Sequence, residues 1–310
     1  MLFFALMLAD DGLGATENGP RIALSFDDAP RPDGPLMSGP ERTRALNAAL
    51  AEAGVRQAAF FVTTQNLRTI ADHDRLRAYV AAGHVLANHS HAHRWLSRST
   101  VDETLADIDR ATALLSAFDG TRPWFRFPYL DEGHDHERRD RLRDGLAERG
   151  LVNGYVTVDN YDWYLDARLQ KAIEAGMQVD HDALGRVYVE TLVDAVAFYD
   201  DIARATLGRS PAHVLLLHEN DLAAMHVGDL VRALRTRDWR IIGIDEAYSD
   251  PIATQFPDTL FNGQGRVAAL ARAAGTPAAK LIHVSEDEAW LDQLIEARRI
   301  FSVAPNEPAE

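Results

Sequence analysis

Short apolar runs alternate with longer segments of helical periodicity over most of this chain. Seven runs are short and apolar enough to form strands that are buried on both faces. They lie at residues 21–26, 58–62, 84–87, 124–127, 154–158, 213–217 and 239–244. The pattern therefore predicts a sheet built from seven strands, with a helical segment after most of them.

The intervening segments carry helix start and stop signals. Thr100 and Glu103 form a capping box ahead of an amphipathic stretch that ends at Gly120. Helices are also expected at 41–53, after Pro40, and at 75–82, before Gly83. Strands followed repeatedly by helices indicate parallel pairing, so the expected fold is α/β, a distorted and incomplete (β/α)7 barrel.

The barrel is expected to occupy residues 20–250. A helical insertion is predicted at 165–209, and 251–310 is expected to form a C-terminal extension that packs on the barrel and contains a last helix at about 286–299. Residues 1–19 precede the barrel. Their apolar run, 2–9, lacks the basic start of a secretory signal and is too short to span a bilayer, so it is either the remnant of a signal peptide or a buried start.

Composition narrows the range of functions. The chain has 310 residues and a formal net charge of −15, which argues against binding nucleic acid or an anionic membrane through phosphate neutralisation. It contains no run of about 18 apolar residues, so no transmembrane segment is expected. It also contains no cysteine, so that any metal must be held by His, Asp or Glu.

Ionisable side chains gather just after the predicted strands. In a parallel barrel the carboxyl ends of the strands share one mouth, where such folds carry their chemistry. Side chains that are far apart in the sequence are therefore expected to converge there. The residues concerned are Asp27, Asp28, His89, Arg126, Asp159, Asp162 and His218.

His89 and His93 are spaced i, i+4, so that they would point the same way if the segment were helical, while His91 would point elsewhere. A histidine pair alone is more typical of a surface turn than of a metal site. With Asp28 as a third ligand, two imidazoles and one carboxylate leave a position open for water, as in a catalytic zinc site. We therefore expect a divalent metal at these three residues.

The neighbouring Asp27 projects in another direction from an extended strand end, so it can accept a proton from the activated water. The alternative is an Asp-rich turn before Pro30. His218 is a candidate general acid, and the alternative is a buried structural histidine. Asp162 is expected to hold the other ring nitrogen of His218, and Trp163 to shield that ring. The alternative for this Asp-Trp pair is ordinary packing with a turn cap.

Five short motifs resemble those of the polysaccharide deacetylases, the chitin and peptidoglycan deacetylase type of carbohydrate esterase family four. They occur in the family's order over residues 20–250. They are Ser25-Phe26-Asp27-Asp28-Ala29-Pro30, His89-Ser90-His91-Ala92-His93, Arg126-Phe127-Pro128-Tyr129, Asp159-Asn160-Tyr161-Asp162-Trp163 and Leu216-Leu217-His218.

The resemblance implies metal-dependent hydrolysis of the N-acetyl group of an N-acetylated glycan, with release of acetate. It implies that Asp28, His89 and His93 hold the ion, most often Zn²⁺, with Co²⁺ or another divalent ion as alternatives. Asp27 would be the base steadied by Arg126, and His218, assisted by Asp162, would be the acid. The backbone amide of Tyr129 would bind the oxyanion, and Tyr129 and Trp163 would line the substrate pocket. Export to the periplasm or outside the cell is the corresponding expectation.

Three positions depart from the family pattern: Ala29 and Leu130 replace usual glycines, and Glu219 replaces a usual aspartate. They leave two alternatives open, a small cyclic amide or ureide as the substrate and a carbohydrate-binding relative without catalysis. An aspartate-nucleophile phosphatase fits less well, because its acids are usually spaced Asp-x-Asp and it needs a lysine, whereas here the acids are adjacent and only Lys171 and Lys280 are present.

Overall fold

The computed structural model describes residues 19–303. The apolar run at 2–9 lies outside the described residues, so the signal-remnant hypothesis concerns a segment that the structure does not describe. Within residues 19–303, no helix is both long and apolar enough to cross a membrane.

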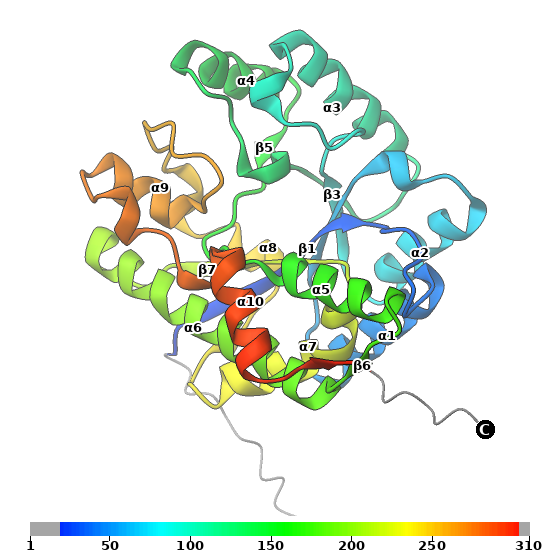
Figure 1. Cartoon of the computed structure of the whole chain (residues 1–310). Coiled ribbons are helices and arrows are strands. Elements are labelled where there is room, and N and C mark those ends of the chain that lie inside the picture. Colours follow the sequence, from blue (N-terminus) through cyan, green and yellow to red (C-terminus); the bar gives the residue numbers. More distant parts are fainter. Residues whose placement is uncertain (1–18, 304–310) are drawn as a thin grey trace, which may run out of the picture.

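A parallel sheet forms the centre of the molecule (Figure 1). Its order is β5-β4-β3-β2-β1-β7, and β8 also pairs with β1. Its strands are β1 (Arg21–Ala29), β2 (Ala59–Val62), β3 (Val85–Asn88), β4 (Thr121–Phe125), β5 (Val152–Asn153), β7 (Ala212–His218) and β8 (Arg240–Ile241). A separate antiparallel pair joins β6 (Gln178–Val179) to β9 (Phe301–Ser302).

The sheet curls toward a barrel through the segment that follows β5. The Gly154 amide donates to the Phe125 carbonyl at 2.7 Å, and the Leu216 amide donates to the Val158 carbonyl at 3.1 Å. Val158 thereby forms an isolated parallel bridge with Leu215 of β7. The predicted incomplete (β/α) barrel is confirmed.

Helices surround the curled sheet, with α1 and α2 on one side and α6 and α9 on the other (Figure 1). Their bounds are α1 (Gly39–Glu52), α2 (Ile70–Ala81), α3 (Val101–Leu115), α4 (His136–Glu148), α5 (Asp162–Glu174), α6 (His181–Leu207), α7 (Asp221–Arg235), α8 (Ile244–Ala247), α9 (Arg266–Ala273) and α10 (Glu288–Ala297). Short 3-10 turns occur at Thr64–Asn66, Leu96–Arg98, Pro128–Leu130, Pro251–Thr254, Ala278–Lys280 and Val284–Glu286.

The elements differ from the predicted ones mainly at their ends. No continuous strand forms at 154–158, where the fifth strand is predicted: β5 ends at Asn153 and only Val158 forms a bridge, because this segment bonds first to β4 and then to β7. Helix α2 starts at Ile70 and not at 75, since Thr69 and Asp72 form a capping box upstream. The capping box of Thr100 and Glu103 begins α3 as predicted. The insertion contains two helices, α5 and α6.

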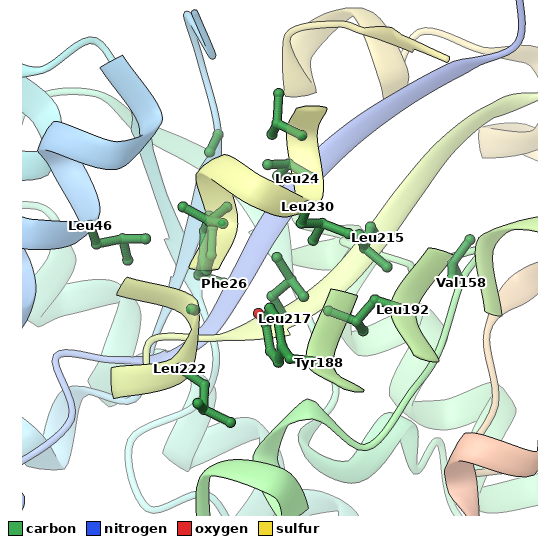
Figure 2. Packing of buried hydrophobic residues seen from close by; sticks show 14 of the residues in the cluster. Leu24, Phe26, Leu46, Val158, Tyr188, Leu192, Leu215, Leu217, Leu222 and Leu230 are labelled. Atoms are coloured by element: carbon green, nitrogen blue, oxygen red, sulfur yellow. The ribbon is translucent and has the colours of Figure 1, made fainter. Parts of the chain in front are cut away.

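Side chains that alternate along the strands form two apolar clusters, one on each face of the sheet. Leu24 and Phe26 of β1 pack with Leu215 and Leu217 of β7 beneath the helical layer (Figure 2). Residues of the opposite parity, including Ala23, Ala59, Phe61, Ala87, Val214 and Leu216, form a second cluster. Because strand side chains alternate between faces, Asp27, His89 and His218 continue this second set at the strand ends.

Candidate active site

Three side chains converge where β1 and β3 end. The Nε2 atoms of His89 and His93 lie 3.2 Å apart, and the Asp28 Oδ1 atom lies 3.8 Å from His89 Nε2 and 3.3 Å from His93 Nε2. One ligand atom from each residue lies within 4.8 Å of the others. The set predicted to hold a metal is therefore brought together.

The two histidines converge through a turn and not through a helix. Ser90 and His93 have φ values of 70° and 49°, in the left-handed region, so the helical geometry considered for the i, i+4 spacing does not occur. The His93 amide instead donates to Ser90 Oγ at 2.9 Å. His91 points away, as expected, and its Nδ1 lies 3.0 Å from Thr64 Oγ1.

Asp28 also has a left-handed backbone, with φ at 67°. Ala29 is not among the residues with positive φ, so the first loop tolerates alanine where related sequences have glycine. Aspartate is one of the residue types that enter this region most readily. The turn aims the Asp28 carboxylate at His93 while Asp27 remains directed toward the barrel interior.

The electrostatics of these ligands suit a cation. Burial lowers the pKa of His93 to about 4, against the opposing attraction of Asp28, so its imidazole is neutral near pH 7. Burial raises the pKa of Asp28, but the nearby His93, His218, His89 and Arg31 outweigh it and hold that pKa well below its ordinary value. His89 Nδ1 lies 2.9 Å from the Arg126 carbonyl, which fixes a proton there and leaves Nε2 as a ligand. Two imidazoles, each with Nε2 directed at the site, and a carboxylate form a donor set that fits a divalent ion.

Asp27 is held by a buried arginine. The Arg126 guanidinium donates a short hydrogen bond to Asp27, and it also donates to Ser25 Oγ at 3.0 Å and to the Gly154 carbonyl at 2.7 Å. Its carbon centre lies 3.7 Å from the Phe61 ring centroid. The second Asp27 oxygen lies 3.6 Å from His89 Nε2, so this carboxylate borders the candidate metal site.

His218 and Asp162 form a close pair at the end of β7. His218 Nδ1 lies 2.7 Å from Asp162 Oδ1, and the His218 amide donates to Asp162 Oδ2 at 2.9 Å. Burial lowers the pKa of His218, but Asp162, and more weakly Asp28 and Asp27, outweigh it and raise that pKa to about 9. Near pH 7 the imidazolium form therefore predominates, with Nδ1 engaged and Nε2 left for another partner.

Tyr129 and Trp163 belong to two separate groups of aromatic side chains. Tyr129 lies with its ring centroid 3.9 Å from that of Trp95, nearly parallel, and 4.6 Å from that of His93. Trp163 directly follows Asp162, and its ring packs against Tyr161 and Tyr164. Lining of the substrate pocket by Tyr129 and Trp163, and the oxyanion role of the Tyr129 amide, stay predictions.

Tyr129 and Leu130 have φ values of 57° and 49°. A bulky residue in this region is strained, which explains why glycine is usual at position 130. Gly263 of the C-terminal extension donates its amide to the Leu130 carbonyl at 3.2 Å and so helps to hold the loop.

Several neighbours of the site were not predicted. Tyr248 accepts a hydrogen bond from Arg126 at 3.1 Å, and Ser25, although inside the first motif, was given no role. Glu286 of the extension lies near Asp159, where burial and the Glu286 charge raise the Asp159 pKa well above its ordinary value. No local motif marks Tyr248 or Glu286, because both reach the site through tertiary packing.

Comparison with known proteins supports the motif assignment. Residues 14–147 match the family model described as polysaccharide deacetylase. The resemblance predicted from the five motifs is thereby confirmed. Comparison with curated protein sequences gave no match.

Solved structures share the fold at low sequence identity. The polysaccharide deacetylase Bc1974 from Bacillus cereus is 20% identical, covers 72% of this chain and 91% of its own, and has a TM-score of 0.51. The family 4 pseudoenzyme BA3943 from Bacillus anthracis is 17% identical, with 74% and 66% covered and a TM-score of 0.50. A family 4 carbohydrate esterase from Streptomyces lividans, in complex with acetate, is 22% identical, with 74% and 96% covered and a TM-score of 0.49. The first two support the barrel fold.

Proposed function

We propose that the protein hydrolyses the N-acetyl group of an N-acetylated glycan and releases acetate. The observation that carries this proposal is the convergence of Asp28, His89 and His93 beside Asp27, with the His218 and Asp162 pair on the adjacent strand end. The shared fold alone would not suffice, since a pseudoenzyme also has it.

Asp28, His89 and His93 would hold the divalent ion, with Zn²⁺ as the first candidate and Co²⁺ as an alternative. Such an ion supplies Lewis acidity and lowers the pKa of water toward 7. The low pKa of His93 supports this assignment, because a ligand imidazole has to be neutral.

Asp27 would act as the general base for the attacking water. Its position beside His89 supports this role, since a base has to lie within reach of the reacting water. Arg126 holds the carboxylate in one orientation through its own bonds to Ser25 and Gly154. The base is thus oriented by a side chain that is itself fixed in the barrel interior.

His218 would protonate the departing amine. An amine is a poor leaving group, so the acid must carry its proton near neutral pH, and the raised pKa of His218 meets this need. Asp162 occupies Nδ1 and orients Nε2 toward the substrate. The Tyr129 amide and the metal would share the oxyanion.

An acetate-release screen tests this function. Zinc-loaded protein would be incubated with chitooligosaccharides, peptidoglycan, acetylated xylan and an allantoin-like cyclic ureide. We expect acetate from at least one N-acetylated glycan. Ring opening of the ureide without acetate release from any glycan would favour the small-amide alternative, and sugar binding without any turnover would favour a binding protein.

We also propose that the protein acts outside the cytoplasm, because polymeric N-acetylated glycans are found there. Fractionation of the native host, with immunodetection of the protein, tests this. Recovery only in the cytoplasmic fraction would contradict it.

A further inference from the structure

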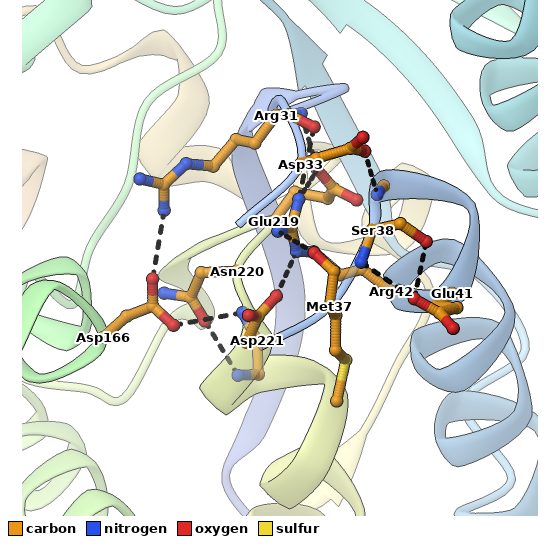
Figure 3. Close-up of polar contacts among 12 residues, drawn as sticks. Arg31, Asp33, Met37, Ser38, Glu41, Arg42, Asp166, Glu219, Asn220 and Asp221 are labelled. Carbon is orange, nitrogen blue, oxygen red and sulfur yellow. Dashed lines mark hydrogen bonds and ion pairs between the residues drawn. The ribbon is translucent and has the colours of Figure 1, made fainter. Parts of the chain in front are cut away.

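A buried ionic cluster joins the end of β7 to the loop that follows Asp28 (Figure 3). Glu219, fully buried directly after His218, accepts hydrogen bonds from Arg75 at 2.9 Å and from Tyr79 at 2.8 Å. Its amide donates to the Asp27 carbonyl at 3.0 Å. The residue that departs from the family pattern therefore ties the strand of the candidate acid to the strand of the candidate base.

The backbone of Arg31 is held by this cluster on both sides. Its amide donates to Glu219 Oε2 at 2.7 Å, and its carbonyl accepts from Arg75 at 2.7 Å and from Arg42 at 3.2 Å. Arg42 is itself fixed by Asp221, whose Oδ1 lies 2.5 Å from Arg42 Nε. The starting point and direction of the Arg31 side chain are consequently well defined.

The Arg31 guanidinium, by contrast, lacks a close hydrogen-bond acceptor for its Nη1 atom in the described part of the chain. It extends away from the cluster toward Asp166 in the first half of α5 (Figure 3). The gap from Arg31 Nη1 to Asp166 Oδ2 is 3.7 Å, too long for a hydrogen bond, and Nη1 is buried without a hydrogen-bond partner within residues 19–303. Asp166 Oδ1 is already engaged by the amides of Asp221 and Leu222.

This guanidinium lies at the rim of the candidate active site. It is three residues beyond Asp28 and close enough to contribute to the lowered Asp28 pKa. Asp166 lies one helical turn beyond Asp162, the partner of His218. Nη1 itself is buried against Asp166, but about a third of the Arg31 side chain is exposed, so a ligand can reach that exposed part.

We propose that Arg31 is a specificity-determining residue that binds a carboxylate on the N-acetylated glycan, an inference that rests on the function proposed above. A planar guanidinium presents pairs of N–H groups that match a carboxylate by two parallel hydrogen bonds, and the exposed part of Arg31 would supply such a pair. A single positive charge flanked by Asp28 and Asp166 suits a monoanion better than a doubly charged phosphate. The substrate would then carry a uronic acid or an ether-linked lactate near the acetamido group.

The test compares zinc-loaded wild type with Arg31→Gln. Substrates would be neutral chitotetraose, an oligosaccharide that contains N-acetylmuramic acid, and a hyaluronan tetrasaccharide, whose acid is a uronate. Acetate release gives kcat/KM, and calorimetric titration gives the affinity for each oligosaccharide independently of turnover. Arg98→Gln removes an equal charge from beside Trp95 and serves as the control.

We expect Arg31→Gln to lower kcat/KM for one of the two acidic glycans by about tenfold or more, relative to kcat/KM for chitotetraose. The change should lie mainly in KM, because the variant loses a charge-assisted hydrogen bond to the bound glycan. Arg98→Gln should leave this ratio unchanged. The acid that responds distinguishes the lactyl from the uronate source. An unchanged ratio and unchanged affinities in Arg31→Gln would overturn the proposal while leaving deacetylation intact. If wild type releases no acetate but Arg31→Gln loses affinity for an acidic glycan only, the role of Arg31 is retained and deacetylation is rejected. If wild type neither binds nor deacetylates any of the glycans, both proposals are rejected.

Discussion

Asp162→Asn should convert His218 from a cationic to a mostly neutral histidine near pH 8. The Asp162 carboxylate contacts the His218 ring at 2.7 Å and its amide at 2.9 Å, and it is the strongest contributor that raises the His218 pKa from 6.5 to about 9. The difference, 9 − 6.5, is about 2.5 units, or about 3 kcal/mol.

Without the Asp162 charge, burial opposes protonation while Asp28 and Asp27 still favour it, so the pKa should return to about 6.5. At pH 8 the protonated fraction would then fall from about nine-tenths to about 3%, a loss of about 30-fold in rate from protonation alone. At pH 6 most of the imidazole would be protonated in both proteins, so the loss there should be smaller. Activity requires the proton on His218, so activity is present below the pKa of His218 and is lost as the pH rises above that pKa.

The assay is kcat/KM for acetate release between pH 5 and 10. A matched control is Asp200→Asn, because Asp200 contacts the buried His213 at 3.1 Å near the other end of the same strand. The control should change stability without moving the alkaline limb of the profile. If Asp162→Asn reduced kcat/KM by the same factor at pH 6 and pH 8, the assignment of His218 as the acid would be refuted.

Three further predictions concern the ion, the base and the barrel interior. Asp27→Asn should abolish acetate release and leave the metal content intact, and equal loss of metal by elemental analysis would reject its role as base. Chelation should abolish activity and zinc or cobalt should restore it, whereas a chelator-resistant rate would exclude metal catalysis. Arg126→Met should lower the free energy of unfolding in urea by about 3–5 kcal/mol, because it leaves the Asp27 charge buried without its partner. Arg77→Met, at an exposed ion pair, should lower it by less than about 1 kcal/mol, and similar losses in both would count against this reasoning.

Much of the fold could be predicted from the sequence because β1, β2, β3 and β7 are short, mostly apolar and buried, and helix-capping residues mark several of the helices that follow the strands. Thr100 and Glu103 mark the start of α3, and the run before His218 forms β7. The path of 154–158 could not be predicted, because its hydrogen bonds pass from Phe125 to Val214 and depend on the curl of the whole sheet.

The part of the candidate site that could be predicted consists of side chains that a sequence motif places at the end of a strand. Asp28, His89 and His93 do converge, although by left-handed turns that i, i+4 spacing did not suggest. Tyr248 and Glu286 come from chain segments beyond the motifs, and their approach depends on how α8 and the extension pack. Long-range packing of this kind leaves no local signal in the sequence.

The most direct test of the central claim is the metal content of purified wild type, His93→Ala and His91→Ala after reconstitution with zinc. His91 belongs to the same loop but contacts Thr64, so His91→Ala controls for disturbance of the loop. We predict one ion per chain in wild type and in His91→Ala, and a marked loss in His93→Ala. Equal metal content in all three proteins, or none in wild type, would contradict the proposed site.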